Sequence, residues 1–381
     1  MPILVLSLSA LLAAPMVSAY REPTPAEERI ALAEKAIAAR PGVARGYGEL
    51  AFALAARARE TADPAFYENA QGAIDKALAL APDDFEALSA RAWVLLGQHR
   101  FEKGRELAQQ LNRRAPDDLR VYGYLVDANV ELGRYDEAEE AAQWMLDLRP
   151  GQLAGLTRAA YLRELFGDVE GALQLMAMAL PQVSPAETEE QAWILTQMAH
   201  LQSLAGRPEL ADPLLDRALE LLPDYHYALA GRARLRAAQG RFAEAATFLQ
   251  RRYEVAPHPE NLFDLARALA RAGRGALAAR AFAEFEVRAR AESEGEDNAN
   301  RELIFYYVDQ AGRHAEALRL AEREIARRRD VRTLDAYAWA LHANGRRADA
   351  QEQMKAALTV GFRDPETVER AERIGVEVAM R

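Results

Sequence analysis

The sequence of 381 residues contains no cysteine, which excludes disulfide bridges, thiolate metal ligands and a cysteine nucleophile. Histidine is scarce as well. None of the six histidines is followed by another four residues later, and no His-Glu-x-x-His motif occurs, so the usual helical zinc pair is absent. The sequence therefore predicts no metal site and no cofactor, and no grouping of nucleophile, base and acid indicates an enzyme.

An excess of positive charge is also lacking. The chain has 48 basic and 58 acidic residues, and its formal net charge of -10 repels a phosphate backbone at long range. Basic residues are scattered, and the one run of three, Arg327-Arg328-Arg329, is typical of a helix C-terminus, where cations favour the helix dipole. We therefore expect no nucleic-acid partner.

Long apolar stretches are missing after residue 20. Before it, Ile3 to Ala14 form an apolar run that is followed by Pro15 and by Val17-Ser18-Ala19, a small-x-small pattern typical of signal peptidase sites. The sequence predicts a signal peptide over 1–19, cleaved after Ala19, and hence a periplasmic or extracellular protein. A retained anchor is the alternative, although the run is shorter than the roughly 20 residues that span a membrane. The segment also lacks the usual Lys or Arg near its start.

One motif recurs along most of the chain. Its glycines are separated by 34, 39, 34, 33, 39 and 33 residues, and they are Gly133, Gly167, Gly206, Gly240, Gly273, Gly312 and Gly345. His99 takes the glycine's place 34 residues before Gly133. A period near 34 with two insertions predicts stacked helical hairpins.

Small residues recur at two fixed distances from this turn. Seven residues before it stand Ala92, Ala160, Ala199, Ala233, Ala266 and Ala338, and five residues after it stand Gly104, Ala138, Ala172, Ala211, Ala245, Ala278, Ala317 and Ala350. Paired helices approach closely only where side chains are short, so these columns indicate the crossing points of each hairpin. Prolines end several second helices, at Pro116, Pro150, Pro223 and Pro257.

This pattern of small residue, Gly, Tyr or Phe, Ala and Pro resembles the tetratricopeptide repeat family. The resemblance covers residues 44–362 in about nine repeats. It implies an all-α, right-handed α-solenoid with a concave groove, and the predicted signal peptide makes this an exported member of the family. No separate catalytic domain has room in the chain.

Flanking segments are expected to cap the solenoid. Thr24-Pro25-Ala26-Glu27 predicts a capping helix over 24–41, and Asp364-Pro365-Glu366 predicts a last helix over 364–378. Insertions are expected near 61–64, 185–191 and 291–300. Within them, Ser184-Pro185-Ala186-Glu187 is interpreted as an extended helix start, and the acidic Glu292 to Asp297 as a mobile solvated loop, since it lacks the spacing of a calcium loop.

The family resemblance implies a binding surface. In this family the first helix of each hairpin lines the groove, and the column six residues before the turn points into it: Phe52, Trp93, Asp127, Tyr161, His200, Arg234, Arg267, Tyr306 and Trp339. Neighbouring positions add Thr157, Trp193, Thr196 and Tyr227. Aromatic rings and Arg contribute much of the binding energy at interfaces. The alternative is that the rings pack between successive first helices as part of the core.

These patterns predict a non-enzymatic adaptor that holds a protein or peptide segment in the groove. Exposed rings also stack on sugars, so a glycan-handling envelope protein is an alternative. A self-assembling scaffold, in which the rings form contacts between copies, is another, and a homo-oligomer is possible on that reading. An enzyme with a site between repeats is the least favoured.

Overall fold

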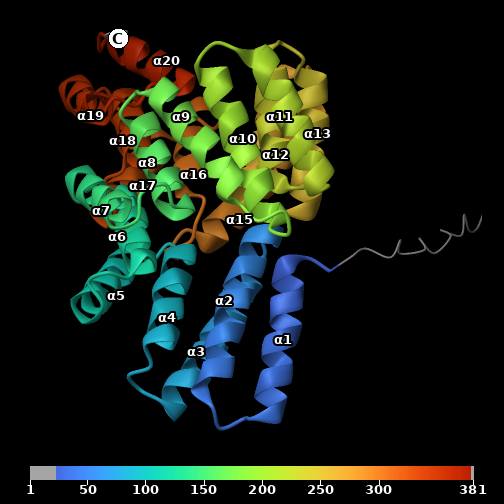
Figure 1. Ribbon diagram of the computed structural model, residues 1–381. Helices are drawn as coiled ribbons and strands as arrows, with labels where there is room; N and C mark the ends of the chain where they lie inside the picture. The colour runs from blue at the N-terminus through green and yellow to red at the C-terminus, as the bar shows by residue number, and fades with distance from the viewer. Residues whose placement is uncertain (1–22, 379–381) are drawn as a thin grey trace, which may run out of the picture.

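The structure, a computed structural model, describes residues 23–378, and twenty α-helices account for most of them. No strand occurs in that range. Nine antiparallel hairpins follow one another along the chain (Figure 1). The predicted all-α solenoid of helical hairpins is therefore confirmed. The expected signal segment over 1–19 lies outside the described residues.

The first helices of the hairpins form the inner layer of the solenoid. They are α2 (Ala44–Thr61), α4 (Phe85–Gly97), α6 (Leu119–Glu131), α8 (Leu153–Leu165), α10 (Thr188–Leu204), α12 (His226–Ala238), α14 (Pro259–Arg271), α16 (Asn300–Asp309) and α18 (Val331–Ala343). Successive first helices contact one another, as α2 contacts α4 and α16 contacts α18.

The second helices form the outer layer. They are α3 (Ala65–Leu80), α5 (Phe101–Arg114), α7 (Tyr135–Leu148), α9 (Val169–Ala179), α11 (Pro208–Leu221), α13 (Phe242–Val255), α15 (Gly275–Glu292), α17 (His314–Arg327) and α19 (Arg347–Thr359). A short 3-10 helix, η1 (Leu180–Gln182), follows α9.

Two further helices flank the hairpins. α1 (Pro25–Ala39) begins with the expected capping box, in which the Thr24 amide donates to the Glu27 carboxylate at 2.8 Å. α20 (Pro365–Ile374) begins after Asp364, whose carboxylate accepts from the amide of Glu366 at 3.0 Å. One local expectation is wrong. The helix after Ser184-Pro185 does not begin there, because residues 184–187 form turns and α10 begins at Thr188.

The small-residue columns lie in the core. Ala160, Ala199, Ala233, Ala266 and Ala338 are all buried, as are the alanines five residues after each turn. At these positions the two helices of a hairpin cross with only a methyl group between them. Leucine and aromatic side chains on either side of the crossings fill the remaining space between neighbouring hairpins.

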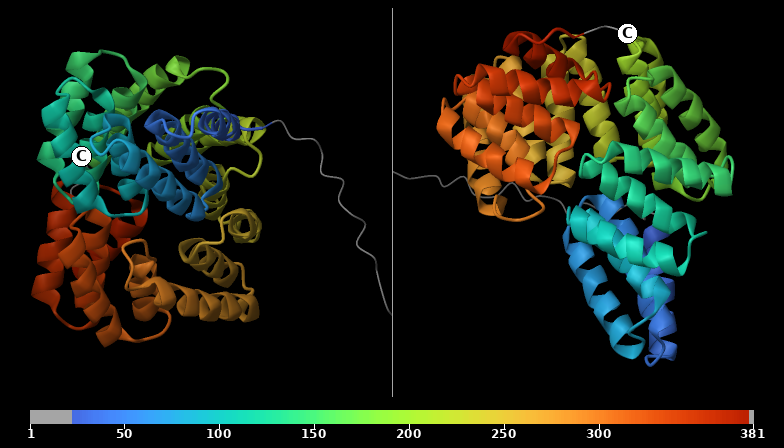
Figure 2. Two further views of the ribbon diagram at one scale, coloured as in Figure 1. Left: turned by 90° about the horizontal axis from the view of Figure 1, so that it is seen from below. Right: turned by 90° about the vertical axis from the view of Figure 1, so that its left-hand side faces the viewer.

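The solenoid winds so tightly that its successive superhelical turns touch. The Tyr135 hydroxyl accepts a hydrogen bond from the amide of Val331 at 2.9 Å, across 196 residues. The His258 imidazole contacts the carbonyl oxygen of Ala62, again across 196 residues. Each contact joins the turn of one hairpin to the beginning of the hairpin six places later, and Figures 1 and 2 show the C-terminal helices lying against those of the early hairpins.

Two further contacts keep nearly the same spacing. His99 Nδ1 lies 3.1 Å from the Asp297 carboxylate, and the Gly167 turn packs against the backbone of Gly361. Four consecutive hairpins therefore touch the next superhelical turn with the same offset. About six hairpins complete one turn, and the hollow of the solenoid is bounded by two turns in contact.

Candidate functional site

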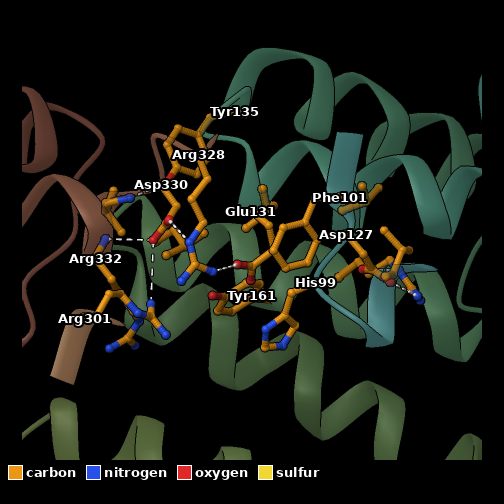
Figure 3. A pocket seen from close by; sticks show the side chains of 16 residues that line it. His99, Phe101, Asp127, Glu131, Tyr135, Tyr161, Arg301, Arg328, Asp330 and Arg332 are labelled. Carbon is orange, nitrogen blue, oxygen red and sulfur yellow. Dashed lines mark hydrogen bonds and ion pairs between the residues drawn. The ribbon is translucent and has the colours of Figure 1, made fainter. Parts of the chain in front are cut away.

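A cavity of about 410 Å³ lies where the two superhelical turns meet. Asp127 and Glu131 of α6 and Tyr161 of α8 line one wall, and Arg301 of α16 and Arg332 of α18 line the opposite wall (Figure 3). Its size is within the range of small-molecule sites or of a few side chains of a guest. The contact between turns thus creates the cavity.

The position of Arg328 follows from the end of α17. The helix ends at Arg327, in agreement with the interpretation of the Arg327-Arg328-Arg329 run as a helix terminus. Arg328 then adopts an extended conformation with φ −154° and ψ 154°. Its side chain is 9% exposed and extends between Glu131 and Asp330 in Figure 3.

Each acidic side chain of the cavity either already accepts hydrogen bonds from the protein or has its ionised form disfavoured. Asp330 caps α18, where its carboxylate accepts from the amides of Arg332 at 3.0 Å and Thr333 at 3.2 Å. Burial, and then the negative charge of Asp330, raise the pKa of Glu131. Asp127 forms a bidentate pair with Arg158, at 2.9 and 2.6 Å. This pair closes one end of the cavity.

The arginines are less completely paired. Arg328 lies 3.7 Å from both Glu131 and Asp330, and Arg301 lies 3.9 Å from Asp330, distances too long for hydrogen bonds. The Arg332 guanidinium lies 5.0 Å from the ring centre of Phe362 and has no ion pair among the described residues. Three guanidiniums therefore face the cavity with unused donors.

Of the predicted groove residues, the structure brings only Asp127 and Tyr161 into this cavity. Arg301, Arg328 and Arg332 were missed, because the groove column contains only residues six before each turn. The run Arg327-Arg328-Arg329, followed directly by the helix-capping Asp330, was the available signal. Nothing in it indicates which distant hairpin it meets.

Two residues that were predicted to line the groove are buried, so the prediction is wrong for them. Trp339 is 3% exposed, and its Nε1 donates to Asp309 at 2.9 Å. Thr196 is 2% exposed, and its hydroxyl donates to the Ala192 carbonyl at 2.7 Å. Both side chains fill space between neighbouring helices, so neither can contact a guest.

Other predicted rings contact the core of the solenoid. Phe52 and Trp93 lie side by side with ring centres 5.9 Å apart, and both pack on the first hairpins' core. Tyr306 stacks on Phe282 at 5.5 Å, and Trp193 packs between two core clusters. Most contacts of these half-buried rings are therefore with the core, as expected if the rings pack between helices and do not bind a guest.

The polar members of the predicted groove are mostly paired. His200 lies 3.0 Å from Glu164, Arg267 lies 2.6 Å from Glu366, and the Thr157 hydroxyl bonds its own helix. Arg234 is exposed and has no ion pair in the described part of the chain, and Tyr227 is 38% exposed. Arg234 and Tyr227, with Tyr161, are the predicted residues best placed to contact a guest.

The side chain of Arg234 is accessible to solvent, but it lies inside the hollow with protein around it. Desolvation, followed by the positive charges of Arg252 and Arg332, lowers the pKa of its guanidinium. Arg332 belongs to α18, six helices further along the chain, so Arg234 faces across the hollow. The inner surface therefore presents free cationic groups on more than one side.

The acidic segment expected to be a mobile solvated loop is instead fixed between the two turns. Asp297 pairs with His99, and Glu296 lies 2.9 Å from Arg100. Arg327 donates to the carbonyl oxygens of Gly295 and Glu294 at 2.7 and 3.1 Å. We call residues 293–299 the acidic clasp.

Within 23–378, no helix is long and apolar enough to cross a membrane. The same residues hold no cluster of three or more His, Cys, Asp and Glu side chains suited to a metal ion.

No family model and no curated protein matches the sequence. Solved structures nevertheless share the fold. A chain of the APC/C hetero-tetramer Cut9–Hcn1 is similar over 86% of this chain, with a TM-score of 0.52 and 12% identity. This chain covers 55% of that chain, little more than half of its length.

The human IFIT1 dimer with PPP-AAAA is similar over 88% of this chain and 87% of that one, with a TM-score of 0.54 and 14% identity. At such identities the likeness extends to the fold alone. Both neighbours are tetratricopeptide repeat proteins, and residues 23–378 form a solenoid of the tetratricopeptide repeat type.

Proposed function

We propose that this protein is a non-enzymatic adaptor that holds a segment of a protein partner in the hollow of its superhelix. The observation that carries the proposal is the inner surface itself. Arg234, Arg332 and Tyr227 are exposed there, whereas most polar groups around them are paired. Large rings and Arg are the side chains that contribute most at protein interfaces.

The neighbouring structures are consistent with this proposal. Cut9–Hcn1 is a hetero-tetramer, so a protein of this fold assembles there with a second kind of chain. In the present chain, the faces between neighbouring hairpins are buried against one another and cannot contact a partner. The surface left for a partner is the hollow and the outer layer.

The glycan alternative loses support from the rings on which it depended. Trp339 is buried, and Trp93 is half-buried, with its ring tilted against Phe52 on the core of the first hairpins. A sugar ring needs an open aromatic face, which Trp339 does not offer and Trp93 offers only in part. Self-assembly stays open as an alternative, because the outer layer exposes Trp144, with 55% of its surface accessible.

Site-specific photo-cross-linking tests the adaptor function. A photoreactive phenylalanine derivative is placed at Arg234, on the inner surface, or at Trp144, on the outer surface, and the protein is irradiated in its native cells. We expect covalent adducts with another polypeptide from position 234 and few from position 144. Adducts only from position 144, or only with a second copy of this chain, would contradict the proposal.

We further propose, from the sequence, that the adaptor acts in the cell envelope or outside the cell. Support comes from the apolar segment that ends at Val17-Ser18-Ala19. The mass of the protein recovered from its native cells tests the proposal. A chain that begins at Tyr20 is the expected result, and a full-length chain with Met1 in the cytoplasm would contradict it.

A further inference from the structure

The cavity between the superhelical turns has more hydrogen-bond donors than its acids can satisfy. Each guanidinium carries five N–H groups, and those of Arg301, Arg328 and Arg332 donate no side-chain hydrogen bond within residues 23–378. Arg328 is nine-tenths buried and adjoins this space. Its guanidinium nitrogens open onto the cavity and lack a hydrogen-bond acceptor among the described residues, so an additional acceptor can reach them there.

The neighbouring acids do not supply that acceptor. Asp330 already accepts from the first amides of α18 and from the Thr333 hydroxyl. Glu131 is 3.7 Å from Arg328, and burial favours its protonated form by raising its pKa. Neither carboxylate forms the short, two-pronged pair that guanidinium geometry favours.

Tyrosines add neutral donors to the same space. The Tyr135 oxygen accepts from the Val331 amide, which leaves its own proton free to donate. Tyr161 also lines the cavity, and burial raises the pKa of its phenol, so the hydroxyl keeps its proton. The donors come from α7 and α8 on one side, and from α16, α18 and the segment between α17 and α18 on the other.

From this geometry we propose that the cavity binds an oxyanion, a carboxylate or a phosphate group, between Arg328, Arg332 and Arg301. In both groups, two oxygens are spaced so that one guanidinium can donate two parallel hydrogen bonds to them. The ligand bridges two superhelical turns. Its binding therefore strengthens their contact as well as filling the site.

This proposal does not depend on the protein-binding function, because a small oxyanion can occupy the cavity without any guest in the hollow. A long nucleic-acid strand is disfavoured by the net charge of -10. A single anionic group, at the end of a ligand or on a side chain, meets the local arginines without that penalty.

Isothermal titration calorimetry with phosphate, pyrophosphate and citrate at constant ionic strength tests the proposal. We expect saturable binding of at least one of them to the wild-type protein. Stronger binding of phosphate or pyrophosphate assigns a phosphorylated ligand, and stronger binding of citrate assigns a carboxylate ligand. The same anion should raise the melting temperature, because it binds only the folded, closed solenoid.

Substitutions locate the site. Arg332→Gln removes an exposed guanidinium without an ion pair and should leave folding intact. We expect it to weaken binding roughly tenfold or more, the usual value of a charge-assisted hydrogen bond. Arg328→Gln should abolish binding. Arg217→Gln is the matched control, since Arg217 is exposed and pairs only with Glu220 on α11.

The proposal is wrong if no anion binds saturably, or if Arg332→Gln and Arg217→Gln bind equally well. Because photo-cross-linking at position 234 reports on a protein guest, either proposal can fail while the other holds.

Discussion

At the turn inside each hairpin, one residue has a positive φ. Glycine adopts this conformation at little cost, which explains the recurring glycines from which the period was recognised. His99 takes the same conformation with φ 56°, and its side chain pairs with Asp297 of the next superhelical turn. The sequence predicted that His99 lies at a turn, but it did not predict that His99 also contacts the next superhelical turn.

Two turn glycines with the same φ should respond differently to alanine. Gly133 has φ 74° and Gly240 has φ 73°. A Cβ at Gly133 would lie 2.4 Å from the carbonyl oxygen of Arg329, whereas a Cβ at Gly240 meets nothing within 4 Å. We expect Gly240→Ala to cost about 1–2 kcal/mol from backbone strain, and Gly133→Ala to cost more.

Urea denaturation compares the two variants, and small-angle scattering shows whether the solenoid has opened. Only Gly133→Ala should increase the radius of gyration. Equal denaturation midpoints and equal radii would contradict the close approach of the two turns at Gly133.

His226 should make stability depend on pH. It is buried beside the end of α2, where its Nε2 lies 3.3 Å from the carbonyl oxygen of Arg59. Burial, followed by the charge of Arg252, lowers its pKa from 6.5 to about 3. Between these values the unfolded chain binds a proton that the folded chain does not. The free energy of unfolding therefore falls as the pH falls from 6.5 toward 3.

The slope from this one group is at most about 1.4 kcal/mol per pH unit. Urea titrations from pH 7 to pH 4 measure it as the difference between the wild type and His226→Gln. His314→Gln, at an exposed position, supplies the background. If stability depends on pH in the same way in both variants, the pKa of His226 is not lowered by burial in the folded protein.

At the scale of elements, the acidic clasp shows where local sequence reasoning fails. Charge density and the lack of apolar residues predicted a solvated loop for Glu292 to Asp297. Its partners, His99 and Arg100, lie on another hairpin almost 200 residues earlier, and no local pattern relates the two. By contrast, the alanine columns predicted buried crossings correctly, because both helices of a crossing belong to one repeat.

Asp297→Asn should loosen the clasp without unfolding the protein. Burial, the largest single influence, raises the pKa of Asp297, but its hydrogen bond with His99 and the neighbouring positive charges together lower it, so these contacts favour the ionised form. Because both partners are half exposed, we expect a loss of only about 0.2–1 kcal/mol.

Hydrogen exchange checks this prediction. Amides in the turn between α4 and α5 should exchange faster in the variant, and added salt should reduce the difference. Glu254→Gln is the control, since the partners of Glu254, Gln250 and Arg251, both belong to its own helix. Unchanged exchange at the α4–α5 turn would mean that the clasp does not hold it.

The groove column was partly misleading for a related reason. A position six residues before the turn lies beside the small residue at the hairpin crossing, and a large ring there can lie over the neighbouring first helix. Trp339 does so and bonds Asp309 of α16, whereas Tyr161 remains at the cavity. The column identifies the side of the helix, and packing between hairpins decides whether the ring is accessible.

At the scale of the molecule, contact between superhelical turns is the property that creates the arginine cavity. The number of hairpins per turn depends on a small rotation between neighbours, summed over about six of them. Each rotation reflects details of side-chain packing that a repeat pattern does not contain. Sequence therefore predicted the solenoid and its repeats, but not which repeats meet or which residues they bring together.

Cross-linking of two introduced cysteines tests this contact most directly, because the chain has no other thiol. His99→Cys and Asp297→Cys replace side chains that touch across the two turns. A short bifunctional thiol reagent should link them within single molecules, whereas Trp144→Cys with Asp297→Cys should stay unlinked. An open solenoid, with no more intramolecular link at 99 and 297 than at 144 and 297, would contradict the account.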